Sequence, residues 1–486
     1  MIPLTLAEVA AAVGGTLHGT DGTATVTGPV EFDSRRLGPG GLFVALPGAR
    51  VDGHHFAAAA VAAGAVGVLA ARPVDAPTVV VPPAAAAGST LKCYALAADT
   101  TGAGVAVLAA LARLARTVID TLSAGPAGLH VVGITGSSGK TSTKDMVAAL
   151  LAPLGCTVAP PGSFNNEVGH PWTALRADER TRHLVLELSA RGPGHIAALC
   201  AVAPPSIGVV LNVGSAHLGE FGSRQVVAAT KGELIEALPP GGLAVLNADD
   251  PAVSAMSART TARVVRFGLA ETSDVHAADV VLDAGGCAGF RLCAPAGQAP
   301  VRLAVPGAHQ VSNALAAIAV ALELGATPES VAAVLGDYRP ASRWRMEVAE
   351  RADGVTVIND AYNANPESVR AALQALVAMA GGGRRSWAVL GPVSELGMAE
   401  TAAHEEIGRL TVGLGVDRLV VVGERARAMH RTAGQDSVLV PDVQAALALL
   451  RAELRSGDVV LVKASRAHRL ERVAEGLLVA GERSGA

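Results

Sequence analysis

The chain has 486 residues, more than one hydrophobic core supports, so we expect about two to four domains. Half of the residues are hydrophobic and the formal net charge is −4, so there is no basic excess of the kind that nucleic-acid binding needs, and we expect no nucleic-acid partner. The five cysteines are scattered without a Cys-x-x-Cys pair, so neither a disulfide framework nor a zinc site is favoured.

Two further features concern the cellular location. Glu8 interrupts the first residues before an apolar segment forms, so we expect no signal peptide. The longest uncharged run, residues 56–71, is too short and too rich in alanine and glycine to span a membrane. We therefore expect a cytoplasmic protein without an integral membrane segment.

Residues 1–126 form the first predicted domain, a small α/β unit. Thr5 precedes an amphipathic run and is expected to cap a helix, and residues 43–46 and 66–69 have the composition of short buried strands. Ser34 and Arg35 follow another predicted strand, where a surface position and a ligand contact are equally good interpretations. Residues 105–119 show helical spacing and lead to a linker rich in glycine and proline.

The most informative stretch follows this linker. An apolar strand up to Ile134 is followed by small residues, a lysine and a hydroxyl residue, and then by a helical pattern from Met146. Backbone N–H groups in such a strand–loop–helix turn can hold phosphate oxygens, and the helix N-terminus adds positive potential. Ile134 stands where the first Walker glycine belongs, so an ordinary turn rich in glycine and serine is the alternative. The expected phosphate-binding residues are Gly136, Ser137, Ser138, Gly139, Lys140, Thr141 and Ser142.

Strands and helices alternate from residue 127 to about 340, which predicts a mainly parallel sheet with ligands at its carboxyl edge. Polar residues follow several of the predicted strands there: Asn165, Asn166, Glu187 and His217. Lys231 lies in a segment, residues 229–233, that we expect to begin a helix. Residues 262–305 are predicted to be short antiparallel strands, and Asn313 precedes a helix rich in alanine.

Hard oxygen ligands together with an imidazole suit Mg²⁺ or Mn²⁺ beside a nucleotide. Glu187 and His217, at the ends of different strands, could supply them. Each residue taken alone has an ordinary interpretation, as a solvated strand-end carboxylate or a loop histidine.

Residues 341–486 form a further α/β unit, in which five predicted strands precede helical patterns or loops. Arg345 precedes the first strand, and Asp360 stands at its end. Asn363 and Asn365 lie in the following loop, and Pro366 suits the first turn of the next helix.

Taken together, these motifs resemble those of the Mur ligases. The resemblance covers almost the whole chain and rests on residues 135–141, whose loop in this family also lacks the first Walker glycine, and on residues 33–35, 43–48, 164–169, 231–233, 345–347 and 359–366. It implies an N-terminal domain with a linker helix for the UDP end of a substrate (1–126), a central P-loop-type parallel-sheet ATPase domain (127–340) and a C-terminal Rossmann-like ligase domain (341–486).

The resemblance also implies a reaction. Within the family, residues 164–169 and 359–366 resemble the ligase that adds D-alanyl-D-alanine to UDP-N-acetylmuramoyl-tripeptide for peptidoglycan synthesis. ATP would phosphorylate the peptide carboxylate, and the dipeptide amine would attack the acyl phosphate. The implied cofactors are ATP and two Mg²⁺ ions, and a monomer is expected.

The residue roles follow from the same resemblance. Lys140, Lys231, His217 and Arg345 would be catalytic, and Lys231 would be carbamylated. Thr141, Glu187, His217 and Lys231 would hold metal. Asn313, Arg345 and Asp360 would contact the nucleotide beside the phosphate loop. The remaining residues would serve the other substrates: Ser34, Arg35, Asn165, Asn166, Asn363 and Asn365.

Several readings stay open. Pro392 replaces an acidic residue of the family pattern and Ala464 replaces a glycine, which leaves a related ligase with another amine acceptor as a hypothesis. A P-loop kinase or ATPase would explain residues 131–145 but not Lys231 or the loop of residues 362–366. A non-catalytic relative would be expected to lack metal ligands, and none is missing.

Overall fold

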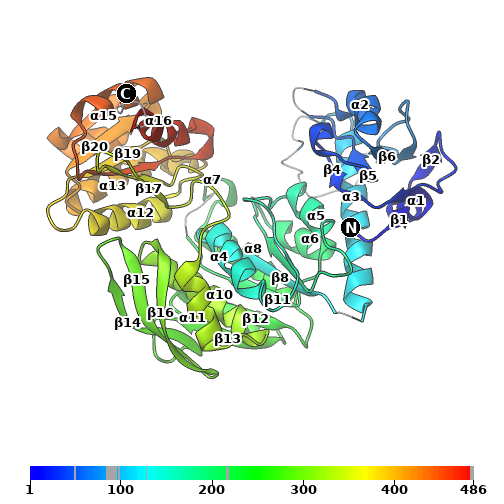
Figure 1. Ribbon diagram of the computed structural model, residues 1–486, viewed down its shortest axis with the longest axis horizontal. Helices are drawn as coiled ribbons and strands as arrows, with labels where there is room; N and C mark the ends of the chain where they lie inside the picture. The colour runs from blue at the N-terminus through cyan, green and yellow to red at the C-terminus, as the bar shows by residue number, and fades with distance from the viewer. Residues whose placement is uncertain (49–50, 84–95, 97–98, 127, 215–217, 482–486) are drawn as a thin grey trace.

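A computed structural model describes residues 1–48, 51–83, 96, 99–126, 128–214 and 218–481. The chain forms three α/β domains (Figure 1). Within the described residues, no helix has the length and apolar character needed to cross a membrane.

The N-terminal domain is built on a five-stranded sheet in the order β2-β7-β6-β5-β4, in which only β2 is antiparallel to its neighbour. The predicted helix cap is confirmed, because the Thr5 side chain accepts from the backbone of Glu8 and the Glu8 carboxylate returns to Thr5. The elements are β1 (Leu4–Thr5), α1 (Leu6–Val13), β2 (Thr16–His18), β3 (Thr25–Val26), β4 (Val30–Glu31), β5 (Gly41–Val44), α2 (Ala57–Ala62), β6 (Ala65–Ala70) and β7 (Thr78–Val80).

The linker helix α3 (Ala103–Ala124) is longer than the predicted residues 105–119. One hydrophobic cluster runs from Leu6 of α1 through Leu111 and Leu114 of α3 to Leu184 of the central domain. The N-terminal and central domains therefore share a continuous core, with α3 packed between them.

The central domain contains a nine-stranded sheet in the order β16-β15-β14-β13-β12-β11-β8-β10-β9. Strand β8 lies inside this sheet and is buried on both faces, with Val131 in one hydrophobic cluster and Val132 and Ile134 in another. The strands are β8 (His130–Thr135), β9 (Thr157–Val158), β10 (His183–Glu187), β11 (Ile207–Val210), β12 (Leu243–Asn247), β13 (Arg263–Gly268), β14 (Val275–Leu282), β15 (Cys287–Ala294) and β16 (Gly297–Pro306).

Helices cover both faces of this sheet (Figure 1). They are α4 (Lys140–Leu151), α5 (Gly169–Ala174), α6 (His195–Val202), α7 (Leu218–Phe221), α8 (Arg224–Glu236), α9 (Pro251–Ser254), α10 (His309–Glu323) and α11 (Pro328–Asp337).

Two predictions for this domain are corrected. The helix that carries Lys231 begins at Arg224, not near residue 229, because the Ser223 side chain caps it by accepting from the N–H of Val226. Residues 262–305 are not uniformly antiparallel: β13 is parallel to both β12 and β14, and only β14, β15 and β16 pair in antiparallel fashion. These strands extend the central sheet instead of forming a separate unit.

The C-terminal domain has a six-stranded sheet in the order β17-β18-β22-β19-β20-β21, parallel except for β17. Helices flank it on both faces, with separate hydrophobic clusters against each. The elements are β17 (Glu347–Glu350), β18 (Thr356–Asn359), α12 (Pro366–Met379), β19 (Ser386–Leu390), α13 (Glu400–Gly413), β20 (Arg418–Val422), α14 (Arg427–Ala433), β21 (Ser437–Val440), α15 (Val443–Glu453), β22 (Val459–Lys463) and α16 (Glu471–Gly481).

Candidate active site

The loop between β8 and α4 has a defined conformation. Gly139 has φ +83°, and a Cβ added there would lie 2.3 Å from Asn313 Oδ1, so only glycine fits. Asn212 Oδ1 accepts from the backbone N–H groups of Ser137 and Ser138 at 3.0 and 2.9 Å, which fixes the loop against the end of β11. The loop leads into the N-terminus of a helix of 12 residues, an arrangement that favours anions.

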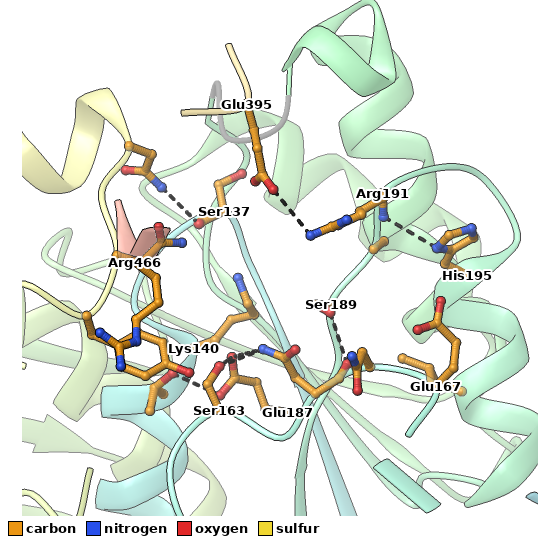
Figure 2. Close-up of a pocket in the computed structure, with 18 of the residues that line it drawn as sticks. Ser137, Lys140, Ser163, Glu167, Glu187, Ser189, Arg191, His195, Glu395 and Arg466 are labelled. Carbon is orange, nitrogen blue, oxygen red and sulfur yellow. Dashed lines mark hydrogen bonds and ion pairs between the residues drawn. The ribbon is translucent and has the colours of Figure 1, made fainter. Parts of the chain in front are cut away.

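A buried carboxylate lies beside this loop. Glu187, the last residue of β10, accepts hydrogen bonds from Thr141 Oγ1 at 2.9 Å, Ser163 Oγ at 3.1 Å and Asn165 Nδ2 at 2.7 Å (Figure 2). Asn165 is itself held, because Ser189 Oγ donates to its backbone oxygen at 3.0 Å. The carboxylate is therefore fixed next to the Thr141 hydroxyl.

The pKa values of two lysines, the partly buried Lys140 and the buried Lys231, are both lowered. Burial lowers the pKa of Lys140, although the carboxylate of Glu187 opposes that effect. Burial also lowers the pKa of Lys231 well below its ordinary value, and the positive charge of Lys140 adds to the shift. Lys140 Nζ donates to the Gly136 oxygen at 2.6 Å, whereas no described residue accepts a hydrogen bond from Lys231 Nζ. An anion bound here would restore favourable interactions for both amines.

The C-terminal domain contributes a cation to the same place. Arg345 Nη2 donates to Thr141 Oγ1 at 3.1 Å, and its guanidinium lies 4.2 Å from the centre of the Tyr362 ring. Trp344 and Met346, on either side of Arg345, have φ of +59° and +50°. A left-handed conformation in residues other than glycine is strained by about 1–3 kcal/mol each, and such strain clusters at functional sites.

A second contact closes the two domains over the loop. Asn365 caps helix α12 through Ser368, and its Nδ2 donates to the backbone oxygen of Ser137 at 3.2 Å. Pro366 occupies the first turn of α12, as predicted.

These groups border a cavity of about 720 Å³ between the three domains. Figure 2 shows Lys140 and Glu187 on one side of it and Arg191, His195 and Glu167 on another. Arg191 of the central domain donates to Glu395 of the C-terminal domain at 3.2 Å, across the opening between them. The linker helix α3 supplies an apolar wall that includes Leu108 and Ala112.

The structure brings many of the predicted site residues together around this cavity. They are Ser137, Ser138, Gly139, Lys140, Thr141, Asn165, Asn166, Glu187, Arg345, Asn363 and Asn365.

Other predicted residues are not among the described residues that line the cavity. Asp360 accepts from the N–H of Met346 at 3.1 Å and from Lys463 Nζ at 2.5 Å, inside the C-terminal domain. The Arg35 side chain is 86 % exposed and pairs with Asp33 in the N-terminal domain, and neither Arg35 nor Ser34 is among the described lining residues. Lys231, Gly136, Ser142 and Asn313 are likewise not among the described lining residues, and His217 lies outside the described residues.

Four residues with clear roles in the geometry were not among the predicted site residues: Asn212, Ser163, Arg191 and Glu395. Asn212 could have been selected because it follows a buried strand, as Glu187 does. Ser163 lies in the same predicted loop as Asn165, two residues before it. Arg191 and Glu395 are surface charges in the sequence, and nothing local marks them as partners.

The donors around Glu187 suit a hard divalent cation. Mg²⁺ in nucleotide sites usually binds one or two carboxylates, phosphate oxygens and water. Glu187 and the Thr141 hydroxyl offer two such oxygens beside the phosphate loop. The described residues contain no group of three histidine, cysteine or acidic side chains that could hold a metal alone. The arrangement can thus bind a polyphosphate, with space for further reactants in the same cavity.

Comparisons with known proteins agree with this geometry. The Mur ligase middle domain matches residues 134–321, the "Mur ligase, glutamate ligase domain" matches residues 344–466, and the "Mur ligase family, catalytic domain" matches residues 29–118. The chain is 58% identical to the UDP-N-acetylmuramoyl-tripeptide–D-alanyl-D-alanine ligase of Mycobacterium tuberculosis, over 98% of both chains. It is 35% identical to the Escherichia coli protein of that name, over 98% of this chain and 99% of the relative.

Solved structures give the same result. A crystal structure of MurF from Acinetobacter baumannii superposes with a TM-score of 0.84 and 29% identity, over 98% of this chain and 99% of that one. MurF ligase from Thermotoga maritima in complex with ADP gives a TM-score of 0.78 and 31% identity, over 94% and 99%.

Proposed function

Because the chain belongs to the Mur ligase family, we propose that it is the ATP-dependent ligase that joins D-alanyl-D-alanine to UDP-N-acetylmuramoyl-tripeptide in peptidoglycan synthesis. The observation that carries this proposal is the cavity that all three domains line, in which a phosphate loop opens into the same space as residues of the C-terminal domain. Two reactants beside the nucleotide can meet there.

The residues of the cavity suit activation of a carboxylate. A carboxylate is a poor acyl donor, and transfer of the γ-phosphoryl group of ATP to one of its oxygens gives an acyl phosphate and ADP. The amine of D-alanyl-D-alanine then attacks the acyl carbon, a tetrahedral intermediate forms, phosphate leaves, and the nitrogen loses a proton. Lys140, the α4 N-terminus and Arg345 are arranged to stabilise the negative charge that develops on the transferred group.

The same cavity holds the reactants in place. Binding two anions beside each other costs electrostatic energy, and fixed cations offset that cost while orienting the reacting atoms. Asn365 and Arg345 reach the phosphate loop from the C-terminal domain, so the loop and the acceptor side close together.

We propose that Thr141, Glu187, His217 and Lys231 hold Mg²⁺ when nucleotide is bound. Such an ion would neutralise phosphate charge. The fit rests on the Glu187 carboxylate, which is buried next to the Thr141 hydroxyl. The lowered pKa of Lys231 supports carbamylation, since the neutral amine adds to CO₂ and loses a proton to give a carboxylate-like group.

A lysine variant tests the carbamate. Lys231→Ala should lose most activity, and short carboxylic acids added to the assay should restore part of it because they replace the missing anion. Lys231→Arg is the matched control: it carries a fixed positive charge, cannot form the carbamate, and fills the space, so it should stay inactive with the acids. Absence of rescue in Lys231→Ala would count against the carbamate.

The overall reaction is tested by phosphate release from ATP and UDP-N-acetylmuramoyl-tripeptide, with D-alanyl-D-alanine, with L-alanyl-L-alanine and with neither. We expect release that depends on the D-dipeptide, together with a product whose mass has grown by the dipeptide residue. Release that ignores the dipeptide would favour a kinase or ATPase, and nucleotide binding without turnover would favour a non-catalytic relative. Turnover with a different amine would favour a related ligase, as Pro392 and Ala464 allow.

The remaining assignments belong to the same proposal. We infer domains of residues 1–126, 127–340 and 341–486, with Ser34 and Arg35 serving the UDP end of the substrate. Asn313 and Asp360 would serve the nucleotide, and Asn165, Asn166, Asn363 and Asn365 the peptide and its acceptor. We also propose a monomer, and the use of ATP supports a cytoplasmic reaction.

A further inference from the structure

A buried ion pair lies on α4 one turn beyond its phosphate-binding end. Lys144 Nζ and Asp145 Oδ1 are 2.5 Å apart, and their side chains are 1 % and 4 % exposed. Neither residue lines the cavity. A buried pair of this kind must have its remaining hydrogen-bonding groups satisfied to be tolerated, so the partners of each group are informative.

Lys144 connects α4 to the residues that surround Glu187. Its Nζ donates to the backbone oxygens of Pro160 at 2.8 Å and Gly162 at 3.1 Å. The next residue, Ser163, donates to Glu187. The lysine thus fixes the start of the loop that orients the buried carboxylate.

The same pair holds the segment that carries Arg345. Asp145 Oδ2 accepts from the backbone N–H of Ser342 at 3.0 Å, and Lys144 Nζ lies 3.3 Å from the Ser342 hydroxyl. Ser342 is buried and stands three residues before Arg345, in the connection between α11 and β17, which contains no helix or strand. The other end of this connection is held by the C-terminal domain, where the N–H of Met346 donates to Asp360.

One rigid helix therefore fixes both partners of the contact between Thr141 and Arg345. Thr141 lies in the first turn of α4, and Lys144 and Asp145 lie in the second. The guanidinium position is set by a short, strained connection whose near end is attached to that same helix. A small shift of Ser342 would move Arg345 relative to the phosphate loop.

We propose that Lys144 and Asp145 are positioning residues that hold Arg345 over the phosphate loop by fixing Ser342. They do not touch the reactants. The effect on turnover rests on the proposed function, because it requires Arg345 to stabilise the transferred phosphoryl group. The anchoring itself does not depend on that function.

The test uses the full chain and the variant Asp145→Asn, which keeps size and shape but weakens both interactions. We expect kcat to fall about tenfold with a smaller change in the KM for ATP, because misplacing a catalytic group by a fraction of an ångström lowers the rate more than ground-state binding. The matched control is Asp458→Asn, which weakens a buried carboxylate paired with Arg385 away from the cavity and should leave kcat unchanged.

A double variant separates positioning from a general structural effect. Arg345→Ala alone should lower kcat about 100-fold. In that background Asp145→Asn should cause no further loss, because the residue it positions is gone. Full multiplication of the two effects would overturn the proposal.

A third measurement does not need activity. Hydrogen–deuterium exchange over residues 339–346 should rise in Asp145→Asn and not in Asp458→Asn, since a neutral amide oxygen is a weaker acceptor for the Ser342 N–H than the carboxylate. Unchanged exchange would overturn the proposal even in a fully active enzyme. Lys144→Met tests the same anchor, and Ser342→Ala, which removes only the hydroxyl, covers the case in which Lys144→Met does not fold. If the wild-type chain shows no ligation, the proposed function fails. The exchange measurement still shows whether Asp145 holds Ser342 in place.

Discussion

Lys140 in the first turn of α4 and Lys144 in the second differ in how many hydrogen-bond acceptors surround their amino groups. Lys140, which lines the cavity, donates to one backbone oxygen, and no described residue accepts from Nζ of Lys231 in α8. One turn further, Lys144 has a carboxylate, two backbone oxygens and a hydroxyl within hydrogen-bonding distance. Lys463 is similarly paired with Asp360. Lysines whose amino groups have several acceptors within the protein stabilise the fold. Lysines with one acceptor or none can still donate to an anionic ligand.

The largest effect on stability is expected when Lys144, the lysine with four acceptors, is removed. Lys144→Ala should lower the free energy of unfolding by about 3–5 kcal/mol, because it leaves the Asp145 charge buried and unpaired. Chemical denaturation followed by circular dichroism measures the change. A loss below that of an exposed ion pair would mean that the buried pair does not hold the scaffold.

The opposite result is expected at the cavity. Lys140→Ala should lower kcat/KM about 10³-fold, since it removes a charged donor from the transferred phosphoryl group. Its free energy of unfolding should change little or increase, because burial disfavours the charge of Lys140 in the absence of ligand. Steady-state kinetics and denaturation on the same sample check both. A strongly destabilised variant would contradict the distinction between the two ends of the helix.

The buried His170 should make the free energy of unfolding depend on pH. Burial lowers the pKa of His170 in α5 to about 4, from an ordinary value of 6.5. Stability is therefore fully present above pH 6.5 and is lost as the pH falls toward 4, because only the unfolded chain takes up the proton in that range. Between pH 7 and pH 5 we expect a loss of about 2 kcal/mol from this residue.

The control for this loss is internal. His170→Gln should flatten the pH dependence of the free energy of unfolding by that amount, and His18→Gln, at an exposed position, should leave the profile unchanged. Equal profiles for wild type and His170→Gln would show that another group is responsible. Burial lowers the pKa of His309 to about 4 as well, so part of the slope remains in the variant.

The smallest effect is expected for an exposed pair. Arg370 of α12 and Glu406 of α13 are 2.9 Å apart, with side chains 48 % and 63 % exposed. Glu406→Gln should change the free energy of unfolding by less than about 1 kcal/mol, because solvent screens the pair. A loss as large as that of Lys144→Ala would remove the contrast between buried and exposed partners.

The features predicted from sequence were those with local causes. Thr5 and Glu8 form a capping box within one helical turn, and Pro366 follows a residue that can cap a helix. The phosphate loop is likewise continuous in the chain, from Ile134 to Thr141. Gly139 in this loop is predictable for the same reason, because the motif requires a residue without a Cβ at that position.

What sequence could not reveal depends on distant partners. Asp145 and Ser342 are 197 positions apart, and Lys144 is an ordinary polar residue of a helix until its burial is seen. The pairing of β13 with strands on both sides required the whole sheet, so residues 262–305 were assigned the wrong pairing. The ion pair of Asp360 with Lys463 could not be predicted either, because the two residues are about one hundred positions apart in the chain.

The core that α3 shares with two domains has a consequence for how the molecule divides. Apolar clusters join residues of the N-terminal and central domains, whereas the clusters of the C-terminal domain contain only residues from Met346 onward. Contacts of the C-terminal domain with the phosphate loop are polar, as between Asn365 and Ser137. Hydrophobic burial joins the first two domains, whereas directional hydrogen bonds hold the C-terminal domain to the phosphate loop. We therefore expect the contacts between the C-terminal domain and this loop to break before the core that α3 shares with two domains.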